Sequence, residues 1–498
     1  MVTKGPCKIK SILHSGPLPA WWVANSRLCK PTRRSGPIGD RSSNSCTGPK
    51  SLSLNRSLAI ALLATSTVVA PCPALSAEMP VVTPINAVAT LIKGVTLWSA
   101  VADEGPLATA ELLVVGDKIK CIGVAVADPG AKDRRARKSC AAEAGAAVVR
   151  DFGGQATVTP GFIESLARIG QVEIELEDGT HDGVARRASN FAHIRAIDGI
   201  VTHSRTVEAA RKGGVTTTLA RPQGNALVVG QSAAFRTQAK LIDAALVRDA
   251  VAIHVNLGDH AKNGEPYVGA RSGQLALLRE ILGQAARLNS ADPKKKLSPA
   301  EAESVQRLRD DSALVALAGL LKAGRPLVAH VDRADDIAAL LRLKRELPMR
   351  LVIAGGAEAH VIAAELSVAR VPVILSPVRA KPYDPDNRRA SDAAAAILAK
   401  AGVVVGLATS DTYNARNLRW DAGFAIAHGM ERGLALAAIS RTIAVVFDLA
   451  AGARPVTGTI VEGGPADLLV FDGDPLGLTG RLRLVATAGE IELDPQQR

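Results

Sequence analysis

Aromatic residues are scarce in this chain: Phe, Trp and Tyr make up 3% of its 498 residues. Apolar residues as a whole still account for 47%, so the hydrophobic core must consist mainly of Ala, Val, Leu and Ile. Together with 44 glycines, this composition favours layered α/β packing over an aromatic-rich β-sandwich. The length is sufficient for one large domain and one smaller domain.

Long apolar runs are also absent from most of the chain, whereas a membrane span needs about 20 consecutive apolar residues. The run 58–70 is shorter than that; it follows Arg56 and leads into small residues that end at Ala77. This layout is typical of a secretory signal peptide. We therefore predict a signal peptide over residues 55–77, export to the periplasm of a bacterium, and no membrane span.

Acidic residues are rare in the first 77 positions, which contain ten Lys and Arg but only one acid, Asp40. This segment therefore carries +9 of the net charge of +12, and the rest of the chain carries +3. A nucleic-acid-binding protein would place such charge on its folded body, so no nucleic-acid partner is expected. Residues 1–54, rich in Pro, Ser, Gly and Arg, are predicted to form a disordered basic extension.

Cysteine is limited to six residues, of which four lie in this leader. The other two are Cys121 and Cys140. In an oxidising compartment they could pair across the loop between them. The spacing of a single pair does not distinguish a disulfide from two free thiols, so both alternatives stay open at this point.

Short strands separated by turns are indicated at both ends of the chain after the leader. Residues 81–151 contain strand-like runs with a hairpin turn in GDKIKCIG. The closing segment VTGTIVEGGPADLLVFDGDP shows the same pattern of short strand-like runs separated by turns. We predict that residues 78–157 and 455–498 combine into one small composite β-sheet domain.

Strands and helices alternate between these segments, over residues 158–454. The expected strands are ATVTPGFI, GVTTTLA, SAAFRT, VAIHVNL, PLVAHV, RLVIAGG, VPVILSP and VVVGLAT. Intervening segments such as GQLALLREILGQAARL have helical periodicity. Eight short strands separated by helices predict a TIM (β/α)8 barrel, with a doubly wound sheet as the alternative.

The active site of a TIM barrel lies at the carboxyl ends of its strands. The polar residues just past the expected strands are Glu164, Arg168, Arg221, His254, His330, Glu358, His360 and Asp411. They follow different strands, so a shared pocket is expected. A structural ion pair between Glu164 and Arg168 is an alternative role for those two.

Seven segments occur in a fixed order: VTPGFIE, AIHVNLG, VAHVDRADDI, VIAGGAEAH, VPVILSP, GLATSDTYNARNLRWDAG and GTIVEGGPADLLVFDGDPL. In this combination they resemble the amidohydrolase superfamily, closest to its imidazolonepropionase-like members. The resemblance extends from about Val81 to Arg498. It implies the barrel fold, hydrolysis of C–N bonds in a small-molecule substrate and a divalent metal, and it is compatible with a homo-oligomer.

The chain departs from the pattern of that family at the first strand, which normally ends in His-x-His. Leu166 and Arg168 stand at the two histidine positions. His254 occupies the fourth-strand ligand position, His330 the fifth, and Asp411 the eighth.

These departures predict at most one metal ion. The guanidinium of Arg168 would repel a second dication, so a binuclear centre is not expected. The resemblance implies one Zn²⁺ held by His254, His330 and Asp411, which is the donor count of an open catalytic zinc site. It also implies that Asp411 moves protons, and Arg168 is expected to polarise a carbonyl or grip a carboxylate as a second catalytic residue.

Substrate binding is assigned to Arg221, at a strand end, and to Asn414 and Arg416, in the polar loop after Asp411. The sequence thus predicts an exported hydrolase that acts on amide or cyclic amide bonds. The alternative is a catalytically decayed amidohydrolase-fold protein that binds a small molecule or serves in an assembly. A metal-independent enzyme that uses Arg168 and Asp411 is a third possibility.

Overall fold

The computed structural model describes residues 89–183, 188–238, 240–262, 269–291, 297–382, 385–451, 454–455 and 457–495. The chain divides into two units between Val81 and Val82, and the second unit, Val82–Arg498, is compact. The predicted basic extension and signal peptide lie outside the described residues. All elements named below belong to the second unit.

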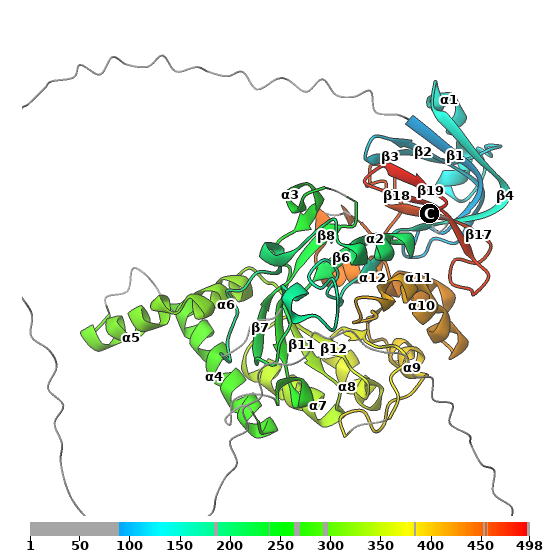
Figure 1. Cartoon of the computed structure of the whole chain (residues 1–498). Coiled ribbons are helices and arrows are strands. Elements are labelled where there is room, and N and C mark those ends of the chain that lie inside the picture. Colours follow the sequence, from blue (N-terminus) through cyan, green and yellow to red (C-terminus); the bar gives the residue numbers. More distant parts are fainter. Residues whose placement is uncertain are drawn as a thin grey trace, which may run out of the picture. The chain divides into compact units, whose positions relative to one another are not determined.

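One seven-stranded sheet contains strands from both ends of the described chain, in the order β19-β18-β17-β4-β1-β2-β3. Figure 1 shows the early strands in blue and cyan beside the late strands in red. The strands are β1 (Ala89–Leu97), β2 (Leu107–Val115), β3 (Lys118–Val124), β4 (Val148–Pro160), β17 (Leu468–Asp472), β18 (Arg481–Thr487) and β19 (Glu490–Leu493).

The strand β4 joins the two ends of the chain within this sheet. It pairs in parallel with β1 on one side and antiparallel with β17 on the other. Val158 of β4 and Val470 of β17 are register partners and are both fully buried. They belong to a separate apolar core that also contains Ile92 and Leu112, so this sheet has a hydrophobic cluster of its own.

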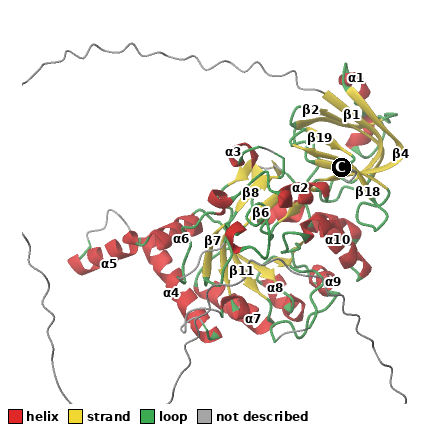
Figure 2. Ribbon diagram, viewed as in Figure 1, coloured by secondary structure: helices red, strands yellow, loops and turns green. Residues whose placement is uncertain are grey.

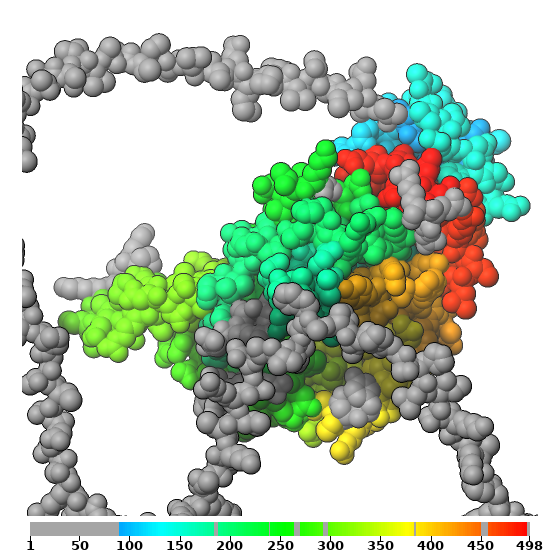
Figure 3. Space-filling view, viewed as in Figure 1, coloured from blue at the N-terminus to red at the C-terminus, as the bar shows by residue number. Residues whose placement is uncertain are grey.

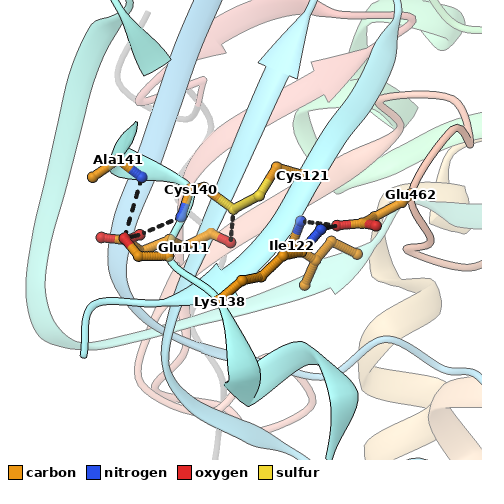
Figure 4. Close-up of a disulfide and its surroundings, with 8 residues drawn as sticks. Glu111, Cys121, Ile122, Lys138, Cys140, Ala141 and Glu462 are labelled. Carbon is orange, nitrogen blue, oxygen red and sulfur yellow. Dashed lines mark hydrogen bonds and ion pairs between the residues drawn. A yellow bond between two sulfur atoms is a disulfide. The ribbon is translucent and has the colours of Figure 1, made fainter. Parts of the chain in front are cut away.

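A disulfide between Cys121 of β3 and Cys140 closes one edge of this sheet. Cys140 directly precedes the short helix α1 (Ala141–Ala144), and its backbone N–H donates to the Glu111 carboxylate at 2.9 Å. Figure 4 also shows Glu462, which accepts from the backbone N–H of Ile122 at 2.7 Å. The structure therefore decides the alternative that the sequence left open, in favour of a disulfide.

The disulfide spans 19 positions, and a cross-link of this loop length stabilises a domain by about 3 kcal/mol in the chain-entropy account. We expect the double variant Cys121→Ala/Cys140→Ala to lose about that much unfolding free energy in urea titrations. Dithiothreitol should lower the midpoint of the wild type but not that of the variant. Equal midpoints for the two proteins without reductant would contradict this expectation.

Apart from a two-stranded ribbon described below, the remaining strands form two further sheets, and each of the eight predicted strand segments contains a strand. The first sheet has the order β14-β13-β12-β11-β10-β7 and the second β5-β6-β8-β9. Their bounds are β5 (Phe162–Glu164), β6 (Val215–Ala220), β7 (Val228–Gln231), β8 (Ala233–Arg236), β9 (Leu246–Arg248), β10 (Ile253–Asn256), β11 (Leu327–Val331), β12 (Leu351–Gly355), β13 (Val373–Leu375) and β14 (Val405–Leu407).

The prediction of eight parallel strands is wrong for the third segment. β8 pairs antiparallel with β6, and β7 pairs antiparallel with β10. A parallel connection needs a crossover of a dozen or more residues, usually with a helix. Only residues 221–227, without a helix, separate β6 from β7. The chain therefore turns back after β6. Because only Ser232 separates β7 from β8, this continuous segment contributes one strand to each of the two sheets.

Helices cover the outer side of the strands, and Figure 2 shows α4, α7 and α8 outside β11. The remaining helices are α2 (Arg205–Lys212), α3 (Ile242–Ala245), α4 (Arg271–Ser290), α5 (Pro299–Asp310), α6 (Ser312–Lys322), α7 (Ala334–Glu346), α8 (Ala363–Val368), α9 (Ala394–Lys400), α10 (Leu418–Ala427), α11 (Arg432–Ala438) and α12 (Arg441–Val446). A two-stranded ribbon of β15 (Ala450–Ala451) and β16 (Arg454–Pro455) follows.

The alternation of side chains along β11 separates two apolar clusters. Leu327 and Ala329 pack into the cluster that contains helix residues such as Leu340 of α7. Val328 packs into a second cluster with strand residues such as Val352. Successive side chains of a strand point to opposite faces, so His330 lies on the same side as Val328.

The helix α5 differs from the helices around the strands because none of its residues is buried. Figure 3 shows it, in yellow-green, uncovered on the viewed face. Its start is set by Ser298 and Glu301, which form a reciprocal capping box, followed by Pro299 at the first helical position. Among the described residues, no helix combines the length and hydrophobicity needed to cross a membrane.

Candidate functional site

Two of the predicted site residues, His254 of β10 and His330 of β11, lie in direct contact. Their rings are nearly parallel with centroids 5.3 Å apart, and Nδ1 of His254 lies 3.0 Å from Nε2 of His330. β10 and β11 are parallel neighbours, and both histidines point to the same side of the sheet. The structure therefore brings together two side chains that are 76 positions apart.

The environment keeps both imidazoles neutral. His254 is fully buried and His330 is 5% exposed. Burial, followed by the positive charge of Arg221, holds the pKa of each histidine well below its usual value of 6.5. Nε2 of His254 is buried and has no hydrogen-bond partner within the described part of the chain. A buried polar atom of this kind marks a place where a ligand or water would bind.

Arg221 supplies the positive charge next to this pair. It directly follows β6, and its Nε donates to the carbonyl oxygen of Leu166 at 2.9 Å. Burial, together with the charge of Arg168, lowers the pKa of Arg221 to about 10, so it stays protonated at neutral pH. Among the described residues, no carboxylate forms an ion pair with Arg221.

Arg168, which was predicted to be catalytic, forms an ion pair with Glu175. Its Nη2 donates to both carboxylate oxygens of Glu175, at 2.8 and 2.7 Å. The predicted ion pair with Glu164 is therefore wrong, since Arg168 pairs with a residue seven positions along the chain. Glu175 thus occupies Arg168, and Arg221 is the guanidinium whose charge acts on both histidines.

Glu164 connects the two sheets. It is fully buried at the end of β5 and accepts hydrogen bonds from the backbone N–H of Leu166, the backbone N–H of Thr409 and the Thr409 hydroxyl, at 3.0, 2.9 and 2.8 Å. Thr409 lies just beyond β14, so this side chain joins the first strand of one sheet to the last strand of the other. Burial raises the pKa of Glu164.

Asp411, predicted to be both metal ligand and proton shuttle, is held by its own loop. Its Oδ1 accepts from the backbone N–H groups of Tyr413 and Asn414 at 2.8 and 2.9 Å, and its Oδ2 accepts from Nδ2 of Asn414 at 3.0 Å. The side chain thereby orders the start of the 3₁₀ helix η6 (Asn414–Asn417).

The two predicted substrate-binding residues of that loop, Asn414 and Arg416, are both exposed. Asn414 is used to bind Asp411. The backbone of Arg416 packs closely against Gly213: a Cβ added at Gly213 would lie 2.4 Å from the Cα of Arg416. The structure thus places Asp411, Asn414 and Arg416 in one loop, but it records no contact between their side chains and the histidine pair.

The donor atoms present do not fit a resident divalent metal. His254 Nδ1 and His330 Nε2 face each other in a hydrogen bond, and the carboxylate of Asp411 binds the amides of η6. No group of three or more His, Cys, Asp or Glu able to hold an ion occurs among the described residues. The charge of Arg221 opposes a second cation. The predicted zinc site therefore lacks its third ligand in this structure.

Sequence reasoning missed a third histidine. His260 lies in the 3₁₀ helix η4 (Gly258–Ala261), and its Nε2 is 3.0 Å from Oδ2 of Asp332. Burial works against the protonated form, but the hydrogen bond and charge of Asp332 raise the pKa of His260. Asp332 directly follows β11, so the rule that polar residues past strand ends are candidates would have found it.

The pKa shifts predict a dependence of stability on pH. Below about pH 6.5 the unfolded chain protonates His254 and His330, whereas the folded chain keeps them neutral. The unfolding free energy should therefore fall with decreasing pH, by up to about 1.4 kcal/mol per pH unit for each histidine.

The variant His254→Asn/His330→Gln keeps amide groups near the positions of Nδ1 and Nε2 and cannot titrate. Denaturant unfolding between pH 5 and 7 should show a shallower slope for this variant, on the order of 1–3 kcal/mol per pH unit less than the wild type. Parallel pH profiles for the two proteins would show that the histidines titrate normally.

Comparison with known proteins is consistent with this geometry. No family model matches the chain. It is 28% identical over 406 residues to the amidohydrolase tasK of Hapsidospora irregularis, which covers 73% of this chain and 39% of that protein. The chain thus spans well under half the length of this curated relative.

One solved structure shares the fold. The amidohydrolase from Thermotoga maritima MSB8 superimposes with a TM-score of 0.68 at 20% identity, over 81% of this chain and the whole of that protein. The match to tasK confirms the resemblance to amidohydrolases that the sequence motifs predict, and the solved structure shows a shared fold.

Proposed function

We propose that this chain, a relative of the amidohydrolases that shares their fold, hydrolyses a C–N bond in a small amide or cyclic amide. The observation that carries the proposal is the pair of neutral, hydrogen-bonded imidazoles, His254 and His330, beside the guanidinium of Arg221. Parallel strand ends are where α/β folds bind their ligands.

The histidine pair supplies a base for this reaction. In the tautomer in which Nδ1–H of His254 donates to Nε2 of His330, the buried Nε2 of His254 carries a lone pair without a partner in the described residues. A neutral imidazole can accept a proton from an attacking water and return it to the leaving nitrogen. A low pKa keeps it in the accepting form at neutral pH.

Arg221 supplies the positive charge that holds the substrate. Part of its side chain reaches solvent, whereas the two histidines are buried. The donor set offers no place for a resident metal, so no step is assigned to one.

Export of the protein is part of the same proposal. The leader supports it by composition, with the layout of a signal peptide over residues 55–77. The disulfide between Cys121 and Cys140 supports it independently, because disulfides persist in oxidising compartments such as the periplasm.

The reaction can be tested on the purified full chain with N-acyl amino acids, dipeptides and cyclic amides. We expect turnover of at least one class, and a loss of about 10²–10⁴ in kcat for His254→Asn/His330→Gln, the contribution typical of a general base. Arg279→Gln removes a charge from the ion pair with Glu346 on the surface and serves as the control. Full activity of the histidine variant, or loss of activity to a chelator with recovery on zinc addition, would contradict the proposal.

A binding protein without turnover is the second candidate. It is favoured by Asp411, because the residue expected to move protons is held by backbone amides of η6. Saturable binding of a panel compound without any product would identify this case.

A further inference from the structure

We infer that Arg221 is a recognition site for a carboxylate, so that the molecules taken here carry a free carboxylate close to the amide, as N-acyl amino acids and dipeptides do. The amide part of this inference rests on the proposed function, whereas the carboxylate part rests on the geometry around Arg221 alone.

Other arginines enclosed by this fold have their charge or their N–H groups satisfied. Arg168 pairs with Glu175, and Arg271 pairs with Asp336 at 2.8 Å. Arg419 has no carboxylate partner, but its two Nη atoms donate to the carbonyl oxygens of Pro475, Gly477 and Gly480, at 2.9–3.1 Å. The Nη atoms of these three guanidinium groups thus have carboxylate or carbonyl acceptors, which offset the cost of desolvating the charge, although the buried Nε of Arg168 has no partner among the described residues.

Arg221 is different from these residues. Its Nε has one acceptor, the carbonyl of Leu166, and neither Nη atom has a hydrogen-bond partner in the described ranges. The guanidinium fork therefore presents parallel N–H donors with nothing to receive them. That arrangement matches the two oxygens of a carboxylate, which accept such a fork in two parallel hydrogen bonds.

The nearby carboxylates of the chain are already used. Glu164 accepts from Leu166 and Thr409, Glu175 from Arg168, and Asp411 from the amides of η6. The adjacent histidines are neutral and bring no negative charge. The charge of Glu164 acts on Arg221 from a distance, but no carboxylate among the described residues pairs with the Nη atoms of Arg221, which stay available to the carboxylate of a ligand. The orphaned Nε2 of His254 lies near the same guanidinium.

The guanidinium of Arg221 supplies a positive charge at the strand ends where amidohydrolases of this type hold a metal ion. Leu166, at a first-strand histidine position, contributes its carbonyl oxygen to orient Arg221. One fixed positive charge on a side chain thus occupies the cluster. A monoanionic planar group complements it better than a neutral carbonyl does.

The test uses two probes that differ only in charge, N-acetylglycine and N-acetylglycinamide, titrated into the full chain by calorimetry. Wild-type protein should bind N-acetylglycine about tenfold or more tightly than the amide, because hydrogen bonds to charged groups contribute more than neutral ones. Arg221→Met should bind both probes equally. Arg279→Gln, which removes a charge at the surface, should keep the wild-type preference.

A stability measurement separates recognition from a structural role. Arg221→Met removes one hydrogen bond and an unmatched charge, so its melting temperature should equal or exceed that of the wild type. Arg419→Met removes three hydrogen bonds to carbonyls and should lower the melting temperature. A fall for Arg221→Met as large as that for Arg419→Met would assign Arg221 to the scaffold and overturn the inference.

The outcomes also separate this inference from the proposed function. Equal affinity of wild type for the two probes, or failure of N-acetylglycine to bind, overturns the carboxylate site even if amides are hydrolysed. A preference for N-acetylglycine that depends on Arg221, without turnover of any amide, supports the site and removes the hydrolase. With turnover, Arg221→Met should raise KM more than it lowers kcat, because the carboxylate contact is present in the ground state.

Discussion

A protonated guanidinium beside two imidazoles is the interaction on which the site depends. Burial raises the cost of protonating His254 and His330, and the charge of Arg221 raises it further. The same charge opposes a dication in the cluster. Burial and one guanidinium together keep the two imidazoles neutral.

The scaffold that holds this cluster depends on hydrogen bonds made by buried acids and carbonyls. Glu164 joins the end of β5 to Thr409 beyond β14, and the carbonyl of Leu166 orients Arg221. Both contacts come from the segment in which related proteins would place metal ligands. In this chain the segment contributes to the strand ends through the carboxylate of Glu164 and the backbone of Leu166.

The sequence predicted the features that depend on hydrophobic periodicity and on the position of a residue along the chain. Apolar runs with turn signals located all eight strand segments, and the strand-end positions of His254 and His330 predicted a shared pocket, in which the structure brings the two rings into contact. The sequence did not predict that the third strand segment runs antiparallel. The 221–227 connection is too short for a parallel crossover, but this became clear only when the structure showed that it contains no helix. The resemblance to amidohydrolases predicted the strand-end positions of His254 and His330 but not the contacts that their neighbours make.

Side-chain partners were harder to predict than positions. Arg168 is captured by Glu175 and Asp411 by the amides of η6, and both partners lie within a few residues in sequence. Such local capture depends on loop conformation, which spacing at a strand end does not define. Arg221 was predicted as a substrate-binding residue from its place after β6, and this stays a prediction; the structure adds that its Nη atoms have no hydrogen-bond partner among the described residues.

The most direct measurement of the central claim is the metal content of the protein purified from cells grown with added zinc, determined by elemental analysis alongside His330→Gln. If Arg221 supplies the positive charge of the site, the wild type and the variant should both contain only substoichiometric metal. One equivalent of zinc per chain in the wild type, lost in His330→Gln, would contradict the account, because a dication would then occupy the cluster that we assign to a guanidinium.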